Sequence, residues 1–145
     1  MKSTIRKMIY EDKPQVLEMM RVFYASPALI TNGSEEIFLN DIENCVNENP
    51  YLEGFVIEDS NGIQGYAMVA KSFSTEFGKP CIWIEDIYLK QEHRGKGLGK
   101  KLLEFITEKY QNCIFRLEAE KENENAIKLY EKLGFSPLPY YEMKK

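Results

Sequence analysis

The spacing of hydrophobic residues over the first fifty positions predicts a strand followed by two helices. Residues 4–9 alternate between apolar and polar side chains and predict the strand. Asp12 and Pro14 predict the start of a helix that we expect to end near Tyr24. Ser34 predicts the N-cap of the second helix, because acidic residues follow in its first turn. The apolar residues expected to face the core from these helices are Val16, Leu17, Met20, Phe23, Ile37, Phe38, Ile42, Cys45 and Val46.

The hydrophobic period changes to two in the middle of the chain. Residues 51–59 and 63–74 alternate and predict a hairpin that turns at residues 60–62. A further strand is predicted over residues 81–89. A helical spacing then returns, with one apolar face formed by Leu98, Leu102, Leu103, Ile106 and Tyr110.

The last third of the chain predicts three more short elements. Residues 114–118 form a strand, residues 124–133 a helix and residues 138–143 a last strand. The complete order is βααβββαβαβ, which predicts a mixed α/β fold, and the length predicts one domain over residues 1–145.

Composition and charge narrow the range of functions. The chain is 43% hydrophobic and 29% charged, as is typical of a globular domain. Its net charge of −4 argues against a nucleic-acid partner and mildly favours cationic substrates. No apolar run of about eighteen residues is present, so we expect no membrane partner. Cys45, Cys81 and Cys113 are widely spaced, so neither a disulfide framework nor a metal site is expected, and a reducing cytoplasm is the expected location.

The glycine-rich stretch at residues 91–100 carries the strongest chemical signal. It lies between a predicted strand and a predicted helix, where the unpaired amides of the first turn and the helix dipole favour an anionic phosphate. Gly95, Gly97 and Gly99 allow close approach of the backbone, and Arg94 and Lys100 add positive charge. The spacing matches neither the dinucleotide pattern nor the nucleotide-triphosphate loop. An ordinary glycine-rich turn remains the alternative for this stretch alone.

Two motifs together resemble the GNAT superfamily of N-acetyltransferases. The pattern Arg94-x-x-Gly97-x-Gly99 resembles the pyrophosphate loop with which that superfamily binds acetyl-coenzyme A (acetyl-CoA). The downstream pattern, Asn123 to Tyr130 followed by Gly134 and a phenylalanine, resembles its last helix. The resemblance covers about residues 80–136. It implies the GNAT fold, a mixed sheet splayed between its fourth and fifth strands to admit the pantetheine arm.

The resemblance also implies the catalytic residues. Tyr130 matches the tyrosine that lies beside the sulfur and acts as the acid. Glu85 is the favoured base, and Asp86 is a second candidate; the pair is nearest to the diamine acetyltransferase branch. On a regular strand Glu85 and Asp86 point to opposite faces, unless a bulge intervenes.

The same resemblance implies the binding residues for acetyl-CoA. Ile87 and Leu89 offer backbone groups to the pantetheine amides and the thioester carbonyl. Asn123, or alternatively Asn125, contacts the arm, although Asn123 could instead be only a helix cap. The phosphate contacts fall on Arg94, Gly95, Gly97, Gly99 and Lys100.

The expected activity is direct transfer of an acetyl group to a primary amine in a ternary complex. A small, polyamine-like amine is the first expectation, with a protein or peptide amine or a non-catalytic acyl-CoA-binding module as alternatives. The acceptor pocket is not readable from the sequence. Its candidate residues are Tyr24, Glu35, Glu36, Tyr140 and Tyr141. Many GNAT relatives form dimers, so a homodimer is one of the oligomeric states that the sequence leaves open.

Overall fold

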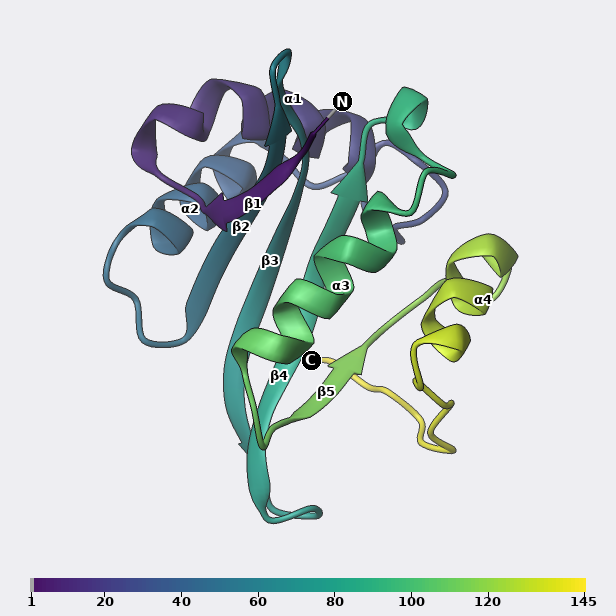
Figure 1. The fold of residues 1–145 in the computed structure, drawn as a ribbon. Coiled ribbons are helices and arrows are strands. Elements are labelled where there is room, and N and C mark those ends of the chain that lie inside the picture. Colours follow the sequence, from purple (N-terminus) through teal and green to yellow (C-terminus); the bar gives the residue numbers. More distant parts are fainter. Residues whose placement is uncertain (1) are drawn as a thin grey trace.

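A computed structural model describes residues 2–145 and contains one twisted mixed sheet with helices on both faces (Figure 1). The strands, in the order β1-β2-β3-β4-β5, are β1 (Thr4–Lys7), β2 (Leu52–Asp59), β3 (Gly62–Ser74), β4 (Lys79–Leu89) and β5 (Ile114–Leu117). The helices are α1 (Lys13–Tyr24), α2 (Glu35–Val46), α3 (Leu98–Lys109) and α4 (Glu124–Lys132), with short 3₁₀ helices at Tyr10–Asp12 and Gln91–His93. The first nine predicted elements are therefore confirmed, each within a few residues of its expected ends.

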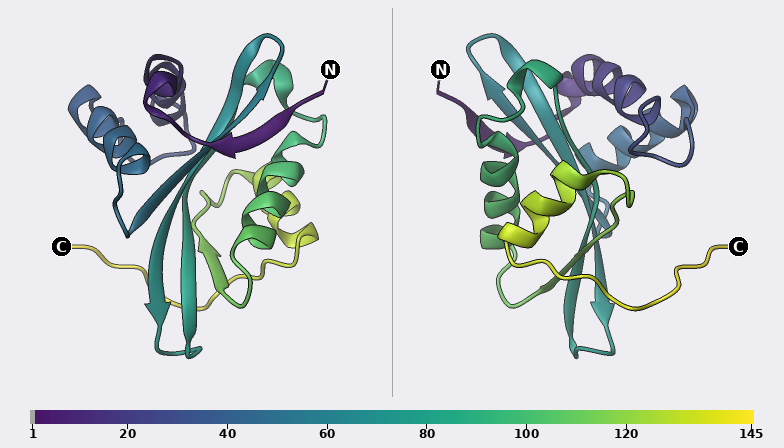
Figure 2. Two further views of the ribbon diagram at one scale, coloured as in Figure 1. Left: turned by 60° about the vertical axis from the view of Figure 1, so that its left-hand side comes forward. Right: turned by 90° about the vertical axis from the view of Figure 1, so that its right-hand side faces the viewer.

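The sheet separates two apolar layers. Helices α1 and α2 cover one face, where Val16, Met20 and Ile42 pack against Tyr66 and Tyr88. Helix α3 covers the other face with side chains that include Leu102 and Ile106, and α4 adds half-buried residues to that layer. Figure 2 shows the two pairs of helices on opposite sides of the sheet. The alternation of β3 explains this division, since Tyr66 and Met68 face one layer while Ala67 and Val69 face the other.

A partly buried ion pair connects β1 to the start of α1. Arg6 donates from both terminal nitrogens to Asp12, at 2.8 Å each, and the Ile9 N–H donates to the same carboxylate at 2.8 Å. Burial alone would raise the pKa of Asp12, but these hydrogen bonds and the Arg6 charge outweigh it and lower the pKa. The pair orients α1, whose last residue, Tyr24, reaches the central sheet.

Strand β4 carries a bulge at Glu85. In the pairing with β3, Met68 lies opposite Asp86 and Val69 lies opposite Ile84, which leaves Glu85 without a partner residue. The extra residue changes which side chains face which layer: Ile84 joins the α3 layer, whereas Tyr88 joins the α1–α2 layer. The bulge that the sequence left open as an alternative is therefore present.

The sheet is splayed between β4 and β5, as the resemblance implies. The parallel pairing covers only Cys81–Ile84 of β4 and Ile114–Leu117 of β5. Beyond Ile84, β4 continues for five residues while β5 turns away toward α4, and the divergence is visible in Figure 1. The end of this pairing and the bulge coincide at one point of β4.

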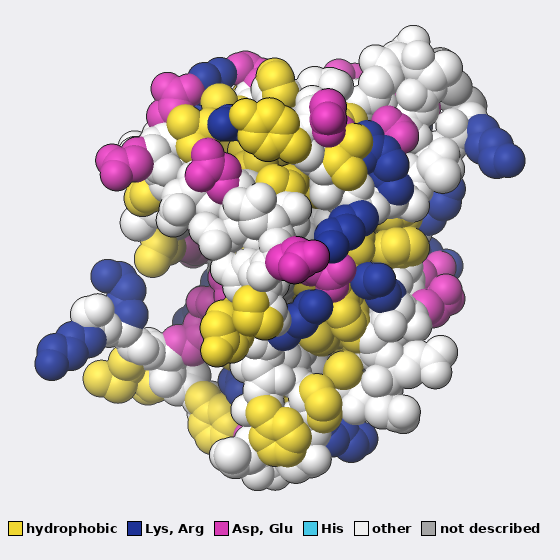
Figure 3. Space-filling view, turned by 90° about the vertical axis from the view of Figure 1, so that its left-hand side faces the viewer, with side chains coloured by type: hydrophobic (Ala, Val, Ile, Leu, Met, Phe, Trp, Pro, Cys, Tyr) yellow, Lys and Arg dark blue, Asp and Glu magenta, His cyan; other side chains and the backbone are white. Residues whose placement is uncertain are grey.

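The predicted last strand is wrong. Within residues 2–145 the sheet has five strands, and residues 138–143 belong to no element. Pro137 and Pro139 have no N–H to donate to a neighbouring strand, which weakens pairing here. The Tyr140 hydroxyl instead donates to Glu76 in the β3–β4 turn, and Tyr141 is 96% exposed. Figure 3 shows the tail leaving the body of the molecule with its terminal lysines.

The Arg6–Asp12 pair predicts a measurable contribution to stability. Replacing Asp12 with Ala leaves Arg6 without its main partner, and we expect the free energy of unfolding to fall by about 2 kcal/mol, less than for a fully buried pair. Chemical denaturation measures this change. The control is Glu58→Gln, because Glu58 bonds the same Arg6 from a more exposed position, where the loss should stay below about 1 kcal/mol. Equal losses in the two variants would contradict the assignment.

Candidate functional site

The glycine-rich loop forms a backbone cradle at the start of α3. Gly95 and Gly97 have φ values of 75° and 80°, in the left-handed region that favours glycine, and Gly97 is the N-cap of α3. No side chain caps this end, so the first amides of the helix remain available to an anion. Lys100 forms an ion pair with Glu104 at 3.7 Å on the exposed side of α3, one turn from the cradle.

The loop is attached to the end of β4. The Arg94 Nε donates to the Leu89 carbonyl at 2.9 Å, and its guanidinium lies 5.3 Å from the centre of the Tyr88 ring. A Cβ on Gly99 would lie 3.6 Å from Leu89 and 3.3 Å from Leu129 of α4. The two sequence motifs are therefore neighbours in space, with the end of β4 between them.

The backbone of Ile87 and Leu89 faces the open edge of β4. The Lys90 N–H donates to the Gln64 carbonyl at 2.9 Å, toward the β3 side. Because successive residues of a strand point their backbone groups to alternate sides, the groups of Leu89 and Ile87 point away from β3. Strand β5 does not reach this part of β4. An extended amide chain could pair here as an added strand.

Tyr130 comes from α4 on the α3 side of β4. Its ring packs in that apolar layer and meets Phe135 edge-on at 6.0 Å, and burial raises its pKa. Among residues 2–145 its hydroxyl has no hydrogen-bond partner, which leaves it free to donate. Asn123 occupies the N-cap position of α4, but its side chain makes no capping hydrogen bond. The structure therefore contradicts the alternative in which the Asn123 side chain caps α4.

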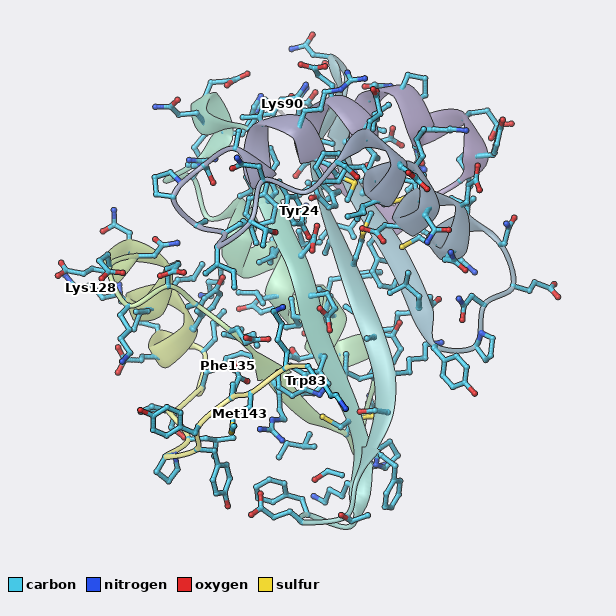
Figure 4. All side chains as sticks on the ribbon, turned by 180° about the vertical axis from the view of Figure 1, so that it is seen from behind. Tyr24, Trp83, Lys90, Lys128, Phe135 and Met143 are labelled. Carbon is cyan, nitrogen blue, oxygen red and sulfur yellow. The ribbon has the colours of Figure 1, made fainter. Side chains whose placement is uncertain are left out.

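Glu85 and Asp86 occupy different environments on the other side of β4. Asp86 is 4% exposed and accepts hydrogen bonds from Tyr24 and Tyr66, each at 2.8 Å. Glu85 is exposed and, among the described side chains, unpaired. The fold still removes part of the water around the Glu85 carboxylate. This desolvation, together with Asp86 and Glu142, raises the pKa of Glu85. Figure 4 shows Tyr24 at the end of α1 beside β4, with Trp83 further down the same strand.

Three acidic residues that the sequence reading missed surround Glu85. Asp41 of α2 has its pKa raised to about 6 by burial, Asp86 and Glu85. Glu118, just past β5, has its pKa raised to about 7 by a hydrogen bond with Glu142 of the tail and by burial. Acidic side chains are visible where the tail joins the body in Figure 3. Asp41 had a signal in the sequence, since it lies between Phe38 and Cys45 on the apolar stripe of α2.

We call Asp41, Glu85, Asp86, Glu118 and Glu142 the acidic group. Of the five acceptor candidates named from the sequence, only Tyr24 contacts it, through Asp86. Glu35 pairs with Arg21, Glu36 is exposed, and Tyr140 bonds Glu76. Tyr141 is almost fully exposed. The part of the chain that the structure describes holds no cluster of histidine, cysteine and acidic residues suited to a metal ion. None of its helices is both long and apolar enough to cross a membrane.

A comparison with protein families decides the classification. The model of the acetyltransferase (GNAT) family matches residues 14–135. The chain belongs to this family. The GNAT match includes both motifs and also the first two helices, which the sequence resemblance did not cover.

Curated GNAT relatives act on amines. The thialysine N-epsilon-acetyltransferase of Sus scrofa is 34% identical over 98 residues, 60% of this chain and 57% of that protein. The spermine/spermidine N(1)-acetyltransferase of Bacillus subtilis is 27% identical over 111 residues, 70% of this chain and 68% of that protein. The chain thus spans little more than half the length of the thialysine enzyme.

Solved structures agree with the GNAT fold. A "possible acetyltransferase" from Clostridium difficile 630 has a TM-score of 0.83, with 20% identity over 99% of this chain and 96% of that one. An aminoglycoside N-acetyltransferase in complex with CoA has a TM-score of 0.78, with 17% identity over 99% of this chain and 94% of that one. The fold of the mixed sheet with its flanking helices is therefore that of GNAT proteins.

The raised pKa of Asp41 predicts that this residue destabilises the free protein. Near pH 7 the carboxylate is ionised in both states, and the folded state carries the full cost of its burial. Protonation removes the cost as the pH falls through about 6 toward the unfolded value of 3.8. We therefore expect Asp41→Asn to raise the melting temperature at pH 7–8, with a gain that disappears near pH 4.

Thermal unfolding monitored by circular dichroism across this pH range measures the effect. The matched control is Glu36→Gln, which removes an exposed carboxylate from the same helix and should show no such pH-dependent gain. A loss of stability in Asp41→Asn at pH 7–8 would contradict the placement of Asp41.

Proposed function

We propose that the protein is an N-acetyltransferase that moves the acetyl group of acetyl-CoA to a small, polyamine-like primary amine. The open edge of β4 at Ile87 and Leu89 carries the proposal. It has an anion cradle at one end, Tyr130 on one face and the acidic group around Glu85 on the other. These are the three chemical functions that acetyl transfer from a phosphate-bearing thioester requires.

The described residues fit acetyl-CoA as co-substrate. The amides at Gly95, Gly97 and Gly99 suit a pyrophosphate, and Arg94 and Lys100 supply nearby positive charge. The outward N–H and C=O groups of Ile87 suit the amides of a pantetheine arm. The Leu89 carbonyl already accepts from Arg94, so the outward Leu89 N–H is left for the thioester carbonyl. Asn123, whose side chain is not used as a cap, is available to contact the same arm.

Glu85 makes the acceptor nucleophilic. A lysine-like amine has a pKa of about 10.4, so its deprotonation near pH 7.4 costs about 4 kcal/mol at 1.36 kcal/mol per unit. A carboxylate whose pKa is raised is a stronger base than an ordinary glutamate. Glu85 therefore takes the ammonium proton, directly or through one water.

The transfer itself forms a C–N bond and breaks a C–S bond. The amine nitrogen attacks the thioester carbonyl, and the oxygen that becomes negative accepts a hydrogen bond from the Leu89 N–H. Donors of this kind contribute about 3 kcal/mol to transition-state stabilisation. The intermediate then expels the sulfur, to which Tyr130 donates its proton. The new C–N nitrogen loses its second proton, which restores the neutral phenol of Tyr130, and the products are the N-acetyl amine and the free thiol.

The acidic surroundings support a cationic acceptor with more than one amine. Asp41 and Glu85 are not paired with any lysine or arginine among residues 2–145, and Asp86 adds a buried negative charge beneath them. A substrate ammonium group is the missing counter-ion. The names of the relatives, which act on thialysine and on spermine or spermidine, support the same class.

A peptide amine is the second candidate. A putative ribosomal-protein-alanine N-acetyltransferase of Bacillus subtilis is 28% identical over 94% of this chain and 82% of that protein. A peptide N-terminus brings one ammonium group, whereas a polyamine brings several. The density of carboxylates around Glu85 therefore favours the polyamine-like acceptor. A cytoplasmic location stays a prediction, and the oligomeric state, a homodimer included, stays open.

The proposal predicts thiol release from acetyl-CoA with diamines and polyamines, at rates well above those with peptides. Tyr130→Phe keeps the ring that packs against Phe135 and removes the proton donor, so turnover should fall by about 100-fold with CoA affinity retained. A thiol-trapping assay measures the rate and calorimetry measures CoA binding. The control is Tyr141→Phe, which removes a hydroxyl from an exposed tail residue.

The outcomes separate the candidates. Faster turnover on peptides than on diamines would reject the small-amine acceptor. CoA binding without turnover on any amine, in the parent and in Tyr130→Phe alike, would support a non-catalytic acyl-CoA-binding module instead.

A further inference from the structure

A buried carboxylate lies directly next to the proposed base. Asp86 is 4% exposed, and its two oxygens each accept one tyrosine hydroxyl: Oδ1 from Tyr24 of α1 and Oδ2 from Tyr66 of β3. No basic side chain pairs with it among the described residues. Burial raises its pKa, and the two hydroxyl bonds oppose that shift by favouring the charged form.

This placement favours Glu85 over Asp86 as the group that takes the substrate proton. Both of its oxygens already accept hydrogen bonds within the protein core, whereas Glu85 is exposed on the open part of the same strand. A base must come within hydrogen-bond reach of the amine or of one bridging water. Of these two neighbours, Glu85 is exposed, whereas Asp86 is held in place by two hydrogen bonds.

The anchor holds the backbone shape that presents Glu85. Glu85 is the extra residue of the bulge, so no cross-strand partner fixes its conformation. The next residue, Asp86, is connected by its side chain both to β3 and to the end of α1. These two bonds fix the C-terminal side of the bulge and so limit where the Glu85 side chain can point.

The anchored charge also acts on Glu85 electrostatically. After burial, Asp86 is the largest cause of the raised pKa of Glu85, followed by Glu142 of the tail. The other titratable groups that interact with Glu85 or Asp86 are Asp41 and Cys45 of α2, Glu118 after β5, Tyr24 of α1 and Tyr66 of β3. All of the carboxylates act in the same direction, and Asp86 is the one held in a fixed position by two hydroxyls.

We infer that Asp86 is a positioning residue that acts on acetyl transfer through Glu85: its tyrosine-held carboxylate fixes the bulge and strengthens Glu85 as a base. The inference rests on the proposed function, because it assigns Asp86 a part in that reaction. It also assigns Tyr24 and Tyr66 a role, since they keep the carboxylate in place. Helix α1 is thereby connected to the reacting centre through one side chain.

The activity test compares pH–rate profiles of Asp86→Asn and Glu85→Gln. The rate should fall at low pH as Glu85 gains its proton. Asp86→Asn removes a neighbouring negative charge, so this acidic limb should move to lower pH, with kcat reduced about 10- to 100-fold through misplacement of Glu85. Glu85→Gln should abolish the limb. A limb that survives in Glu85→Gln and vanishes in Asp86→Asn would make Asp86 the base and overturn the inference.

Tyr24→Phe tests the anchor separately, and decides the matter if Asp86→Asn does not fold. It removes one hydroxyl and keeps the charge of Asp86, so kcat should fall while the acidic limb does not move to lower pH and CoA affinity is retained. A kcat equal to that of the parent protein would overturn the positioning role. A general loss of structure would instead lower CoA affinity as well, which calorimetry detects.

A direct titration keeps this inference separate from the proposed function. Carbon-detected NMR of the Glu85 side-chain carboxyl measures its pKa without any substrate. The expected result is a lower pKa in Asp86→Asn than in the parent protein, whether or not any amine is acetylated. An unchanged pKa would reject the electrostatic role of Asp86, whereas absence of amine turnover in the parent protein would reject the proposed function alone.

Discussion

The structure depends on the point where β4 stops being a regular central strand. Up to Ile84 it pairs on both sides, with β3 and with β5. At Glu85 the β3 pairing shifts by one residue and the β5 pairing ends. Both changes expose polar groups in the middle of a sheet, where backbone N–H and C=O groups are otherwise satisfied by neighbours. The open backbone edge of β4 and the unpaired position of Glu85 therefore arise from the same interruption of the sheet.

The carboxylates around Glu85 destabilise one another, and no basic side chain among the described residues offsets this cost. Neighbouring carboxylates contribute to the raised pKa values of Asp41, Glu85 and Glu118. The ion pairs among the described residues do not include these three. Arg6 stabilises the β1–α1 junction, and Arg94 bonds the end of β4. A cationic acceptor would supply the absent charge. The raised pKa values mean that this region is less stable near neutral pH than it would be with neutral side chains.

The sequence predicted the elements that local patterns determine. Ser34 caps α2 as expected, with its hydroxyl accepting the Ile37 N–H at 3.2 Å, and the glycine loop precedes α3. The prediction of a last strand was wrong because a strand also needs a neighbouring strand to pair with. The alternation of residues 138–143 carries no information about such a partner. Prolines at 137 and 139 were a local sign against it.

The site was predictable only where a motif marked it. Tyr130 and the loop glycines were named from the two motifs. A Cβ added at Gly99 would lie 3.3 Å from Leu129, which places the loop next to α4. The roles of Asp41, Tyr66 and Glu142 depend on tertiary contacts between residues far apart in the chain. The sequence could name a bulge at Glu85–Asp86 only as an alternative to a regular strand. Its presence and position depend on the pairing with β3.

Hydrogen exchange of individual amides, measured by NMR with and without CoA, tests the central claim most directly. If the open edge of β4 binds the pantetheine arm, the amides of Ile87 and Leu89 exchange readily in the free protein and become protected with CoA, together with those of the glycine loop. The amides of β1 and β2 should not change. Protection of the loop alone, with Ile87 and Leu89 unaffected, would contradict the account.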